Sequence, residues 1–176
     1  MKQDPKQLIS ILNSGGIAVV RTDTLYGLLA RAEDEAAVKK VYEVKQRDPS
    51  KSCIVLIADS SQAYGDLSNT IVSDGIPTSI LVDAPKAPAW LLRTNNQLAH
   101  RIPNNDFLKD VIRETGPLIA PSANPESLPP ASTIDEARAY FGDVVDIYID
   151  GGAVSSDIPP SRLIRVTATG DIERLR

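Results

Sequence analysis

Apolar positions recur at helical spacing in some stretches of the chain and in short unbroken runs in others. Near the start, Leu8, Ile11 and Leu12 follow Asp4-Pro5, a pair typical of a helix N-terminus, and Gly15-Gly16 predicts where that helix ends. The same 3.6-residue spacing predicts helices over 34–45, 107–115 and 133–140, with a weaker one over 60–75. Short apolar runs predict strands at 17–20, 54–58, 78–82, 98–102, 118–120, 144–149, 163–166 and 172–175.

The order of these elements decides the fold class. Helices and strands intermix without strict βαβ alternation, and 176 residues is the size of one ordinary domain. We therefore expect a single α/β (α+β) domain over 1–176, with a twisted mixed β-sheet and flanking helices.

The composition of the chain argues against several classes of protein and of catalytic or metal site. A net charge of −4 argues against a protein that coats nucleic acid non-specifically, because such proteins need a net basic field. The single cysteine, Cys53, excludes an intrachain disulfide, and the single histidine, His100, argues against a histidine-based metal site or a Ser-His-Asp triad. Both lie in apolar runs and are interpreted as structural, and Trp90 as a packing anchor. No signal core or long apolar run is present, so we expect a cytoplasmic protein with no membrane partner.

Lys45, Arg47 and Lys51 place three cations where a predicted helix ends. Cations at a helix C-terminus are common because they offset the negative end of the helix dipole, and such side chains contribute less than about 1 kcal/mol to stability. The alternative is a phosphate clamp, in which Arg supplies a bidentate fork and Lys a point charge.

Three polar segments follow or flank predicted strands. Ser122 and Asn124 stand in Pro121–Pro125, Thr22 opens a Thr-Asp-Thr turn, and Ser161 lies in Pro160-Ser161-Arg162. Each has an ordinary explanation as a turn, since Ser, Thr, Asn and Pro all favour turns. Each could equally present hydroxyls and amides to a ligand at the end of a strand.

Taken in order, these segments are similar to those of the YrdC family, the threonylcarbamoyl-AMP synthases. The resemblance rests on Thr22–Leu28, then Lys45-x-Arg47 with Lys51, His100–Pro103, Ser122-Ala123-Asn124, Asp150–Gly152 and Pro160-Ser161, and covers about 15–174. Three positions depart from the family pattern: Arg21 replaces a usual Pro, 73–77 replaces a Trp-Pro-Gly-Pro lead, and Arg162 replaces a common Thr.

The resemblance implies an enzyme, a nucleotidyltransferase that condenses L-threonine, bicarbonate (or CO2) and ATP, for N6-threonylcarbamoyladenosine modification of tRNA position 37. It implies that ATP is a substrate carried with Mg²⁺, that no metal is held by the protein, and that a tRNA-modifying transferase complex takes the product, with direct tRNA contact left open. It assigns catalysis to Lys45, Arg47, Ser122 and Asn124. It assigns substrate and ATP binding to Thr22, Lys51, Arg101, Ser161 and Arg174.

Two other interpretations remain. The same fold forms part of the hydrogenase maturation carbamoyltransferase, but this chain has neither the length nor the Cys clusters of that protein. The other is a non-catalytic RNA-binding or ribosome-maturation module that uses the basic concavity of the same fold. Overall acidity and the presence of the Lys, Arg, Ser and Asn set argue against it.

Overall fold

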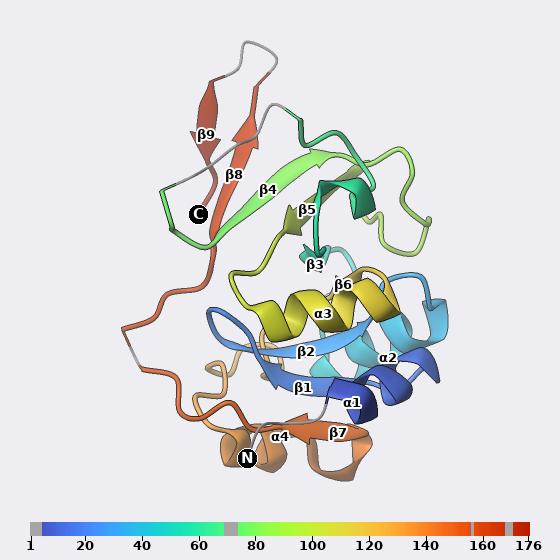
Figure 1. The fold of residues 1–176 in the computed structure, drawn as a ribbon, viewed down its shortest axis with the longest axis vertical. Helices are drawn as coiled ribbons and strands as arrows, with labels where there is room; N and C mark the ends of the chain where they lie inside the picture. The colour runs from blue at the N-terminus through green and yellow to red at the C-terminus, as the bar shows by residue number, and fades with distance from the viewer. Residues whose placement is uncertain (1–4, 69–73, 156, 168–170) are drawn as a thin grey trace.

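A computed structural model describes residues 5–68, 74–155, 157–167 and 171–176 (Figure 1). Its helices are α1 (Pro5–Asn13), α2 (Glu35–Lys45), α3 (Asp106–Thr115) and α4 (Ile134–Phe141), with short 3-10 turns η1 (Ser60–Gln62) and η2 (Gly142–Val144). Its strands are β1 (Ala18–Arg21), β2 (Tyr26–Arg31), β3 (Val55–Leu56), β4 (Thr78–Asp83), β5 (Gln97–Arg101), β6 (Leu118–Ile119), β7 (Ile147–Ile149), β8 (Arg162–Val166) and β9 (Ile172–Arg174). The predicted cap Asp4 and residues 69–73 of the predicted weak helix lie outside the described residues; the rest of that segment forms η1 and turns.

The nine described strands form one mixed sheet in the order β7-β1-β2-β6-β3-β5-β4-β8-β9, which confirms the predicted fold class. β1 with β7, β3 with β5 and β4 with β8 are parallel, and the other neighbours are antiparallel.

Helices cover both faces of the sheet, so there are two apolar layers. Leu8 and Leu12 of α1 pack with Leu108 of α3 on one face, whereas residues of α2 and α4 pack on the other (Figure 1). Alternate residues of β1 belong to different layers: Val20 faces the first and Val19 the second. This is the two-residue period of a strand buried on both sides.

β2 is the element that the sequence pattern did not predict. Residues Tyr26–Ala30 are all buried, so the strand shows no alternation of polar and apolar positions. Its pairing with β1 through the Thr22–Leu25 turn, which is a tertiary feature, makes it a strand.

The end of the sheet formed by β4, β8 and β9 extends beyond the helices (Figure 1). The chain reaches it from β7, at the opposite edge of the sheet, through the long connection that ends at Ser161. This connection brings Ser161 beside Ser79 of β4.

Candidate functional site

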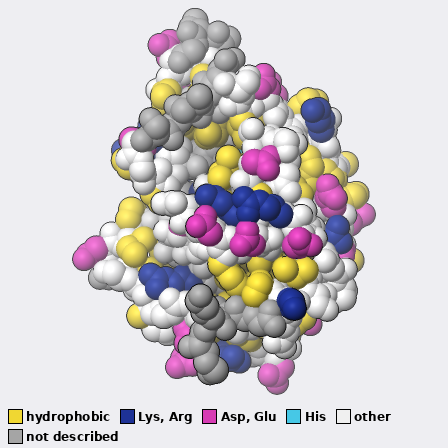
Figure 2. All heavy atoms as spheres, viewed as in Figure 1, with side chains coloured by type: hydrophobic (Ala, Val, Ile, Leu, Met, Phe, Trp, Pro, Cys, Tyr) yellow, Lys and Arg dark blue, Asp and Glu magenta, His cyan; other side chains and the backbone are white. Residues whose placement is uncertain are grey.

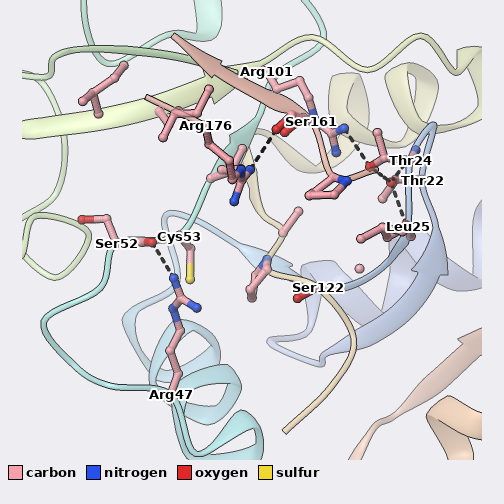
Figure 3. Close-up of a pocket in the computed structure, with 18 of the residues that line it drawn as sticks. Thr22, Thr24, Leu25, Arg47, Ser52, Cys53, Arg101, Ser122, Ser161 and Arg176 are labelled. Atoms are coloured by element: carbon pink, nitrogen blue, oxygen red, sulfur yellow. Dashed lines mark hydrogen bonds between the residues drawn. The ribbon is translucent and has the colours of Figure 1, made fainter. Parts of the chain in front are cut away.

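A cavity of about 700 Å³ lies between the loops that follow α2 and β6 and the strands β5 and β8 (Figure 3). Its lining includes Thr22, Thr24, Tyr26, Gly27, Arg47, Ser50, Ser52, Cys53, Leu81, Ala99, Arg101, Ser122, Pro130, Ser161, Leu163 and Arg176. We call the segments 45–52 and 122–126 the loop wall; Arg47, Ser50, Ser52 and Ser122 are its cavity-lining residues. We call Arg101 of β5, Ser161, Leu163, Arg176 and the Thr22–Thr24 turn the strand wall.

Arg47 reaches the cavity because α2 ends abruptly before it. Gln46 adopts a left-handed conformation (φ 52°), and its N–H donates to Glu43 O. The Arg47 N–H then bonds back to Tyr42 O, and its side chain leaves the helix axis. The guanidinium donates from Nη2 to Ser52 O at 2.8 Å and from Nε to Lys51 O at 3.2 Å, so it is fixed at the loop wall (Figure 3).

Lys45 is buried, with 3% of its surface exposed, and does not line the cavity. Its Nζ donates to Ser122 O and Asn124 O, both at 2.7 Å, and to Asn124 Oδ1 at 3.0 Å. Burial lowers the pKa of Lys45 to about 8, and the charge of Arg47 acts in the same direction. The ammonium is therefore still mostly protonated at neutral pH.

The position of Lys45 at the end of α2 predicts a stabilising effect of less than about 1 kcal/mol, but its burial and its three hydrogen bonds favour a larger one. All three of its donors are used inside the protein. Without Lys45, Ser122 O would still accept from Asn124 N and Asn124 Oδ1 from the Ser122 hydroxyl, whereas Asn124 O would lose the ammonium donor that it has here. The helix-end position suggested exposure, but the loop that buries the side chain is distant in sequence.

Ser122 and Asn124 lie beside Lys45, as the predicted common site requires. Asn124 is buried, and its Nδ2 donates to Leu128 O at 2.6 Å and Pro125 O at 3.0 Å. The Ser122 hydroxyl donates to Asn124 Oδ1 at 2.7 Å and itself lines the cavity. Asn124 thus shapes the loop, whereas Ser122 faces the ligand space.

Lys51 does not line the cavity. Its ammonium forms an ion pair with the Glu126 carboxylate, and about half of its side chain is exposed.

Arg101 dominates the strand wall. It is 4% exposed, its Nη1 lies 3.1 Å from Asp23 Oδ1, and it donates to Thr24 Oγ1 at 3.0 Å. Its Nε has no hydrogen-bond partner among the described residues. Burial lowers the pKa of Arg101; Asp23 opposes this shift and the neighbouring charge of Arg176 adds to it. The strand wall therefore holds two cations close enough to repel each other.

The Thr22–Thr24 segment is the compact turn that its composition predicts. Thr22 Oγ1 donates to Leu25 O at 2.7 Å and accepts from Thr24 N at 3.1 Å. Both hydroxyls are buried and line the cavity, so the turn and a ligand-facing role are compatible here.

Ser161 is buried beside Ser79, with 2.8 Å between their hydroxyl oxygens. Its carbonyl accepts from Arg176 Nη2 at 3.0 Å. Arg174, expected to close the cavity, is exposed on β9 and is not among the lining residues. Arg176 lines it instead, a position to which no sequence motif drew attention.

The departures from the family pattern make contacts outside the cavity. Arg21 Nη1 donates to Gly151 O at 2.6 Å. Arg162 Nη2 lies 2.9 Å from Asp74 Oδ2 and also donates to Thr78 Oγ1, so two departures pair with each other. Neither arginine lines the cavity.

The residues interpreted as structural divide into two groups. His100 is 1% exposed, its Nε2 accepts from Tyr64 N, and burial lowers its pKa to about 4. Trp90 packs against the core and donates to Ala32 O at 3.0 Å. Cys53, though buried in the same core, also lines the cavity (Figure 3), a position its apolar context did not predict.

In the described part of the chain, there is no group of three or more His, Cys, Asp and Glu able to hold a metal, and no helix long and apolar enough to cross a membrane. On the face shown in Figure 2, Lys and Arg side chains lie beside Asp and Glu side chains, so the described residues of this face mix the two charges.

The chain is a one-domain mixed α/β protein with a cavity lined by cationic and hydroxyl side chains. The chain belongs to the Sua5/YciO/YrdC family, whose sequence model, described as telomere recombination, matches residues 10–176.

Relatives agree with this assignment. A threonylcarbamoyl-AMP synthase of Shigella boydii serotype 4 (strain Sb227) is 29% identical over 178 residues, covering 94% of this chain and 92% of the relative. The fold matches P. abyssi Sua5 complexed with L-threonine (TM-score 0.81, 23% identity, 98% of this chain) and HypF in a phosphate- and nucleotide-bound form (TM-score 0.85, 19% identity, 98% of this chain). This chain spans 53% of that Sua5 chain and 28% of that HypF chain.

Proposed function

We propose that this chain is a threonylcarbamoyl-AMP synthase that forms threonylcarbamoyl-AMP and pyrophosphate from L-threonine, bicarbonate or CO2, and ATP. The observation that carries the proposal is the meeting of Arg47, Ser122, Arg101 and Arg176 around one cavity. The curated relatives of this name, which match nearly the whole chain, support the catalytic interpretation over an RNA-binding module.

The chemistry needs positioned charge rather than a covalent nucleophile. The threonine amine and bicarbonate give a carbamate with loss of water. A carbamate oxygen then attacks the α-phosphorus of ATP, and the bond to pyrophosphate breaks, so the reaction is a nucleotidyl transfer. Negative charge grows on phosphoryl oxygens and on pyrophosphate, where fixed cations lower the barrier most.

The residues divide into groups that face the substrates and groups that position them. Arg47 and Arg176 bring cations to opposite walls, and Arg101 adds a buried guanidinium to the strand wall. Thr22, Ser122 and Ser161 supply polar contacts for threonine or the nucleotide. Lys45 and Asn124, predicted to be catalytic, act by holding Ser122 in place.

Magnesium enters with ATP as part of the substrate. Phosphates and water are its preferred ligands in such sites, and the hydroxyls and cations of the lining are suited to the phosphates rather than to the ion. We further propose that the protein works in the cytoplasm and that a tRNA-modifying transferase complex consumes the product.

The test is pyrophosphate release by the purified chain. We expect release that requires both threonine and bicarbonate, with threonylcarbamoyl-AMP detected by mass spectrometry. Release independent of threonine, or ATP binding without turnover, would contradict the proposal.

A further inference from the structure

Glu126 is the last residue of the 122–126 segment of the loop wall, and it joins that segment to the 45–52 segment. Its backbone N–H donates to Lys45 O at 2.8 Å, at the end of α2. Its Oε2 accepts from Asp48 N at 2.5 Å, and its Oε1 pairs with the Lys51 ammonium. One residue of the 122–126 segment thus contacts the 45–52 segment at three successive points.

These contacts determine where Arg47 lies. The Arg47 guanidinium is held by the carbonyls of Lys51 and Ser52, so its position follows the course of the 48–52 loop. Within that loop, Asp48 Oδ1 accepts from both the N–H and the hydroxyl of Ser50. Tyr42 and Glu126 hold this loop from outside it. Tyr42 Oη of α2 donates to Lys51 O at 2.8 Å, and Glu126 contacts the loop from the 122–126 segment, which is distant in sequence.

We infer that Glu126 is a positioning residue, which holds the 48–52 loop so that Arg47 faces the substrate phosphates, and that Lys51 acts as the partner of Glu126 rather than as an ATP ligand. This inference rests on the proposed function for its kinetic consequences only. Its structural part concerns the loop and can be measured without any substrate.

A native probe reports the position of the loop. Cys53, the single cysteine of the chain, follows the loop, is 5% exposed and lines the cavity beside Arg47. The rate at which 5,5′-dithiobis(2-nitrobenzoate) reacts with this thiol depends on how often the loop opens. We expect Glu126→Ala to raise that rate at least about 5-fold and Glu126→Gln, which can still accept from Asp48 N, to raise it less.

Glu114→Gln is the matched control, because this exposed carboxylate lies on α3 and does not line the cavity. It should react at the rate of the unaltered chain. If Glu126→Ala also reacts at that rate while remaining folded by circular dichroism, Glu126 does not hold the loop and the inference fails.

Kinetics of pyrophosphate release separate the two roles of Lys51. If Glu126 positions the loop, Glu126→Gln and Lys51→Met both raise the KM for ATP, by about 10-fold, since a small misplacement of a charged contact is costly. If Lys51 instead binds ATP and Glu126 competes for it, Glu126→Gln lowers that KM, which would overturn the inference.

A double-mutant cycle tests whether the effect passes through Arg47. In an Arg47→Ala background, Glu126→Ala should change kcat/KM by less than about 2-fold, because the group that it positions is absent. An equal, additive loss in both backgrounds contradicts the positioning role. If the unaltered chain shows no turnover, the proposed synthase function is contradicted instead. The rates of thiol reaction would still decide the role of Glu126.

Discussion

The two walls of the cavity use their cations differently. On the loop wall, Lys45 and Arg47 direct their donors to protein oxygens, so each charge is already compensated by carbonyl groups. On the strand wall, Arg101 pairs with Asp23, but its Nε has no hydrogen-bond partner among the described residues, and the charge of Arg176 adds to the lowering of the pKa of Arg101. An anion bound near Arg101 and Arg176 would relieve the repulsion between them, whereas Arg47 would meet an anion with a guanidinium that two carbonyls already hold in place.

The largest effects are expected on the loop wall. Arg47→Ala should lower kcat/KM by about 100- to 1000-fold, the usual cost of removing a charged donor from a phosphoryl-transfer site. Its free energy of unfolding should change by less than about 1 kcal/mol, since the side chain is only half-buried.

Lys45→Met provides the contrast. It should lose activity and also about 2 kcal/mol of unfolding free energy, because three charge-assisted hydrogen bonds are lost and Asn124 O stays without the ammonium donor. Urea unfolding measures the free energies of unfolding of Lys45→Met and Arg47→Ala. Equal values for the two variants would mean that Lys45 does not organise the loop wall.

The next largest effect on kcat/KM is expected on the strand wall. Arg176→Gln should lower kcat/KM for ATP by about 10- to 100-fold, through loss of one charge-assisted contact. Arg174→Gln is the matched control, because Arg174 is exposed on β9 outside the cavity. It should change kcat/KM by less than about 2-fold. The reverse ranking would restore Arg174 as the cavity residue.

These walls also differ in how far the sequence predicts them. Lys45, Arg47, Ser122 and Asn124 lie in short motifs, so their proximity could be predicted from a resemblance. The direction of each side chain could not, because it depends on the left-handed Gln46 and on Glu126. Arg176 stands in no motif, and its place in the cavity follows from the β8–β9 pairing.

The fold, like the site, could be predicted from the sequence only where it depends on local patterns. Amphipathic helices such as α3 were predicted within about one residue, since their apolar stripe is a local property. β2 is buried on both faces as β1 is, but Gly27, a residue depleted in strands, interrupts its apolar run directly after a polar turn, so the sequence pattern does not predict a strand there. The pairing of Asp74 with Arg162 likewise became visible only when β4 and β8 were placed side by side.

A pH effect is expected behind the strand wall, at His100 on β5. The pKa of His100 is about 4 in the folded protein and about 6.5 in the unfolded chain. Between these values the unfolded chain binds a proton that the folded protein does not, so stability falls as pH is lowered from 6.5 towards 4. The loss attributable to His100 should be about 1.5 kcal/mol between pH 6.5 and 5.

Urea unfolding of the unaltered chain and of His100→Gln across that range measures this loss. The variant can keep an acceptor for Tyr64 N but does not titrate there, so its stability should depend less on pH. Parallel pH dependences for the two proteins would show that His100 is not the responsible group.

The smallest effect is expected at Ser127, next to the loop wall. Ser127 has φ 74°, a left-handed conformation that costs a residue with a side chain about 1 kcal/mol and costs glycine little. Ser127→Gly removes this cost but gives the unfolded chain more freedom, so the net gain in unfolding free energy should be about 0.5 kcal/mol. Ser127→Ala keeps the side-chain carbon and should show no gain. Because Ser127 is exposed and does not line the cavity, kcat/KM should stay within about 2-fold of the unaltered value in both variants. A loss of activity in the glycine variant alone would mean that the rigidity of this turn, and not only the Glu126 contacts, keeps the loop wall in shape.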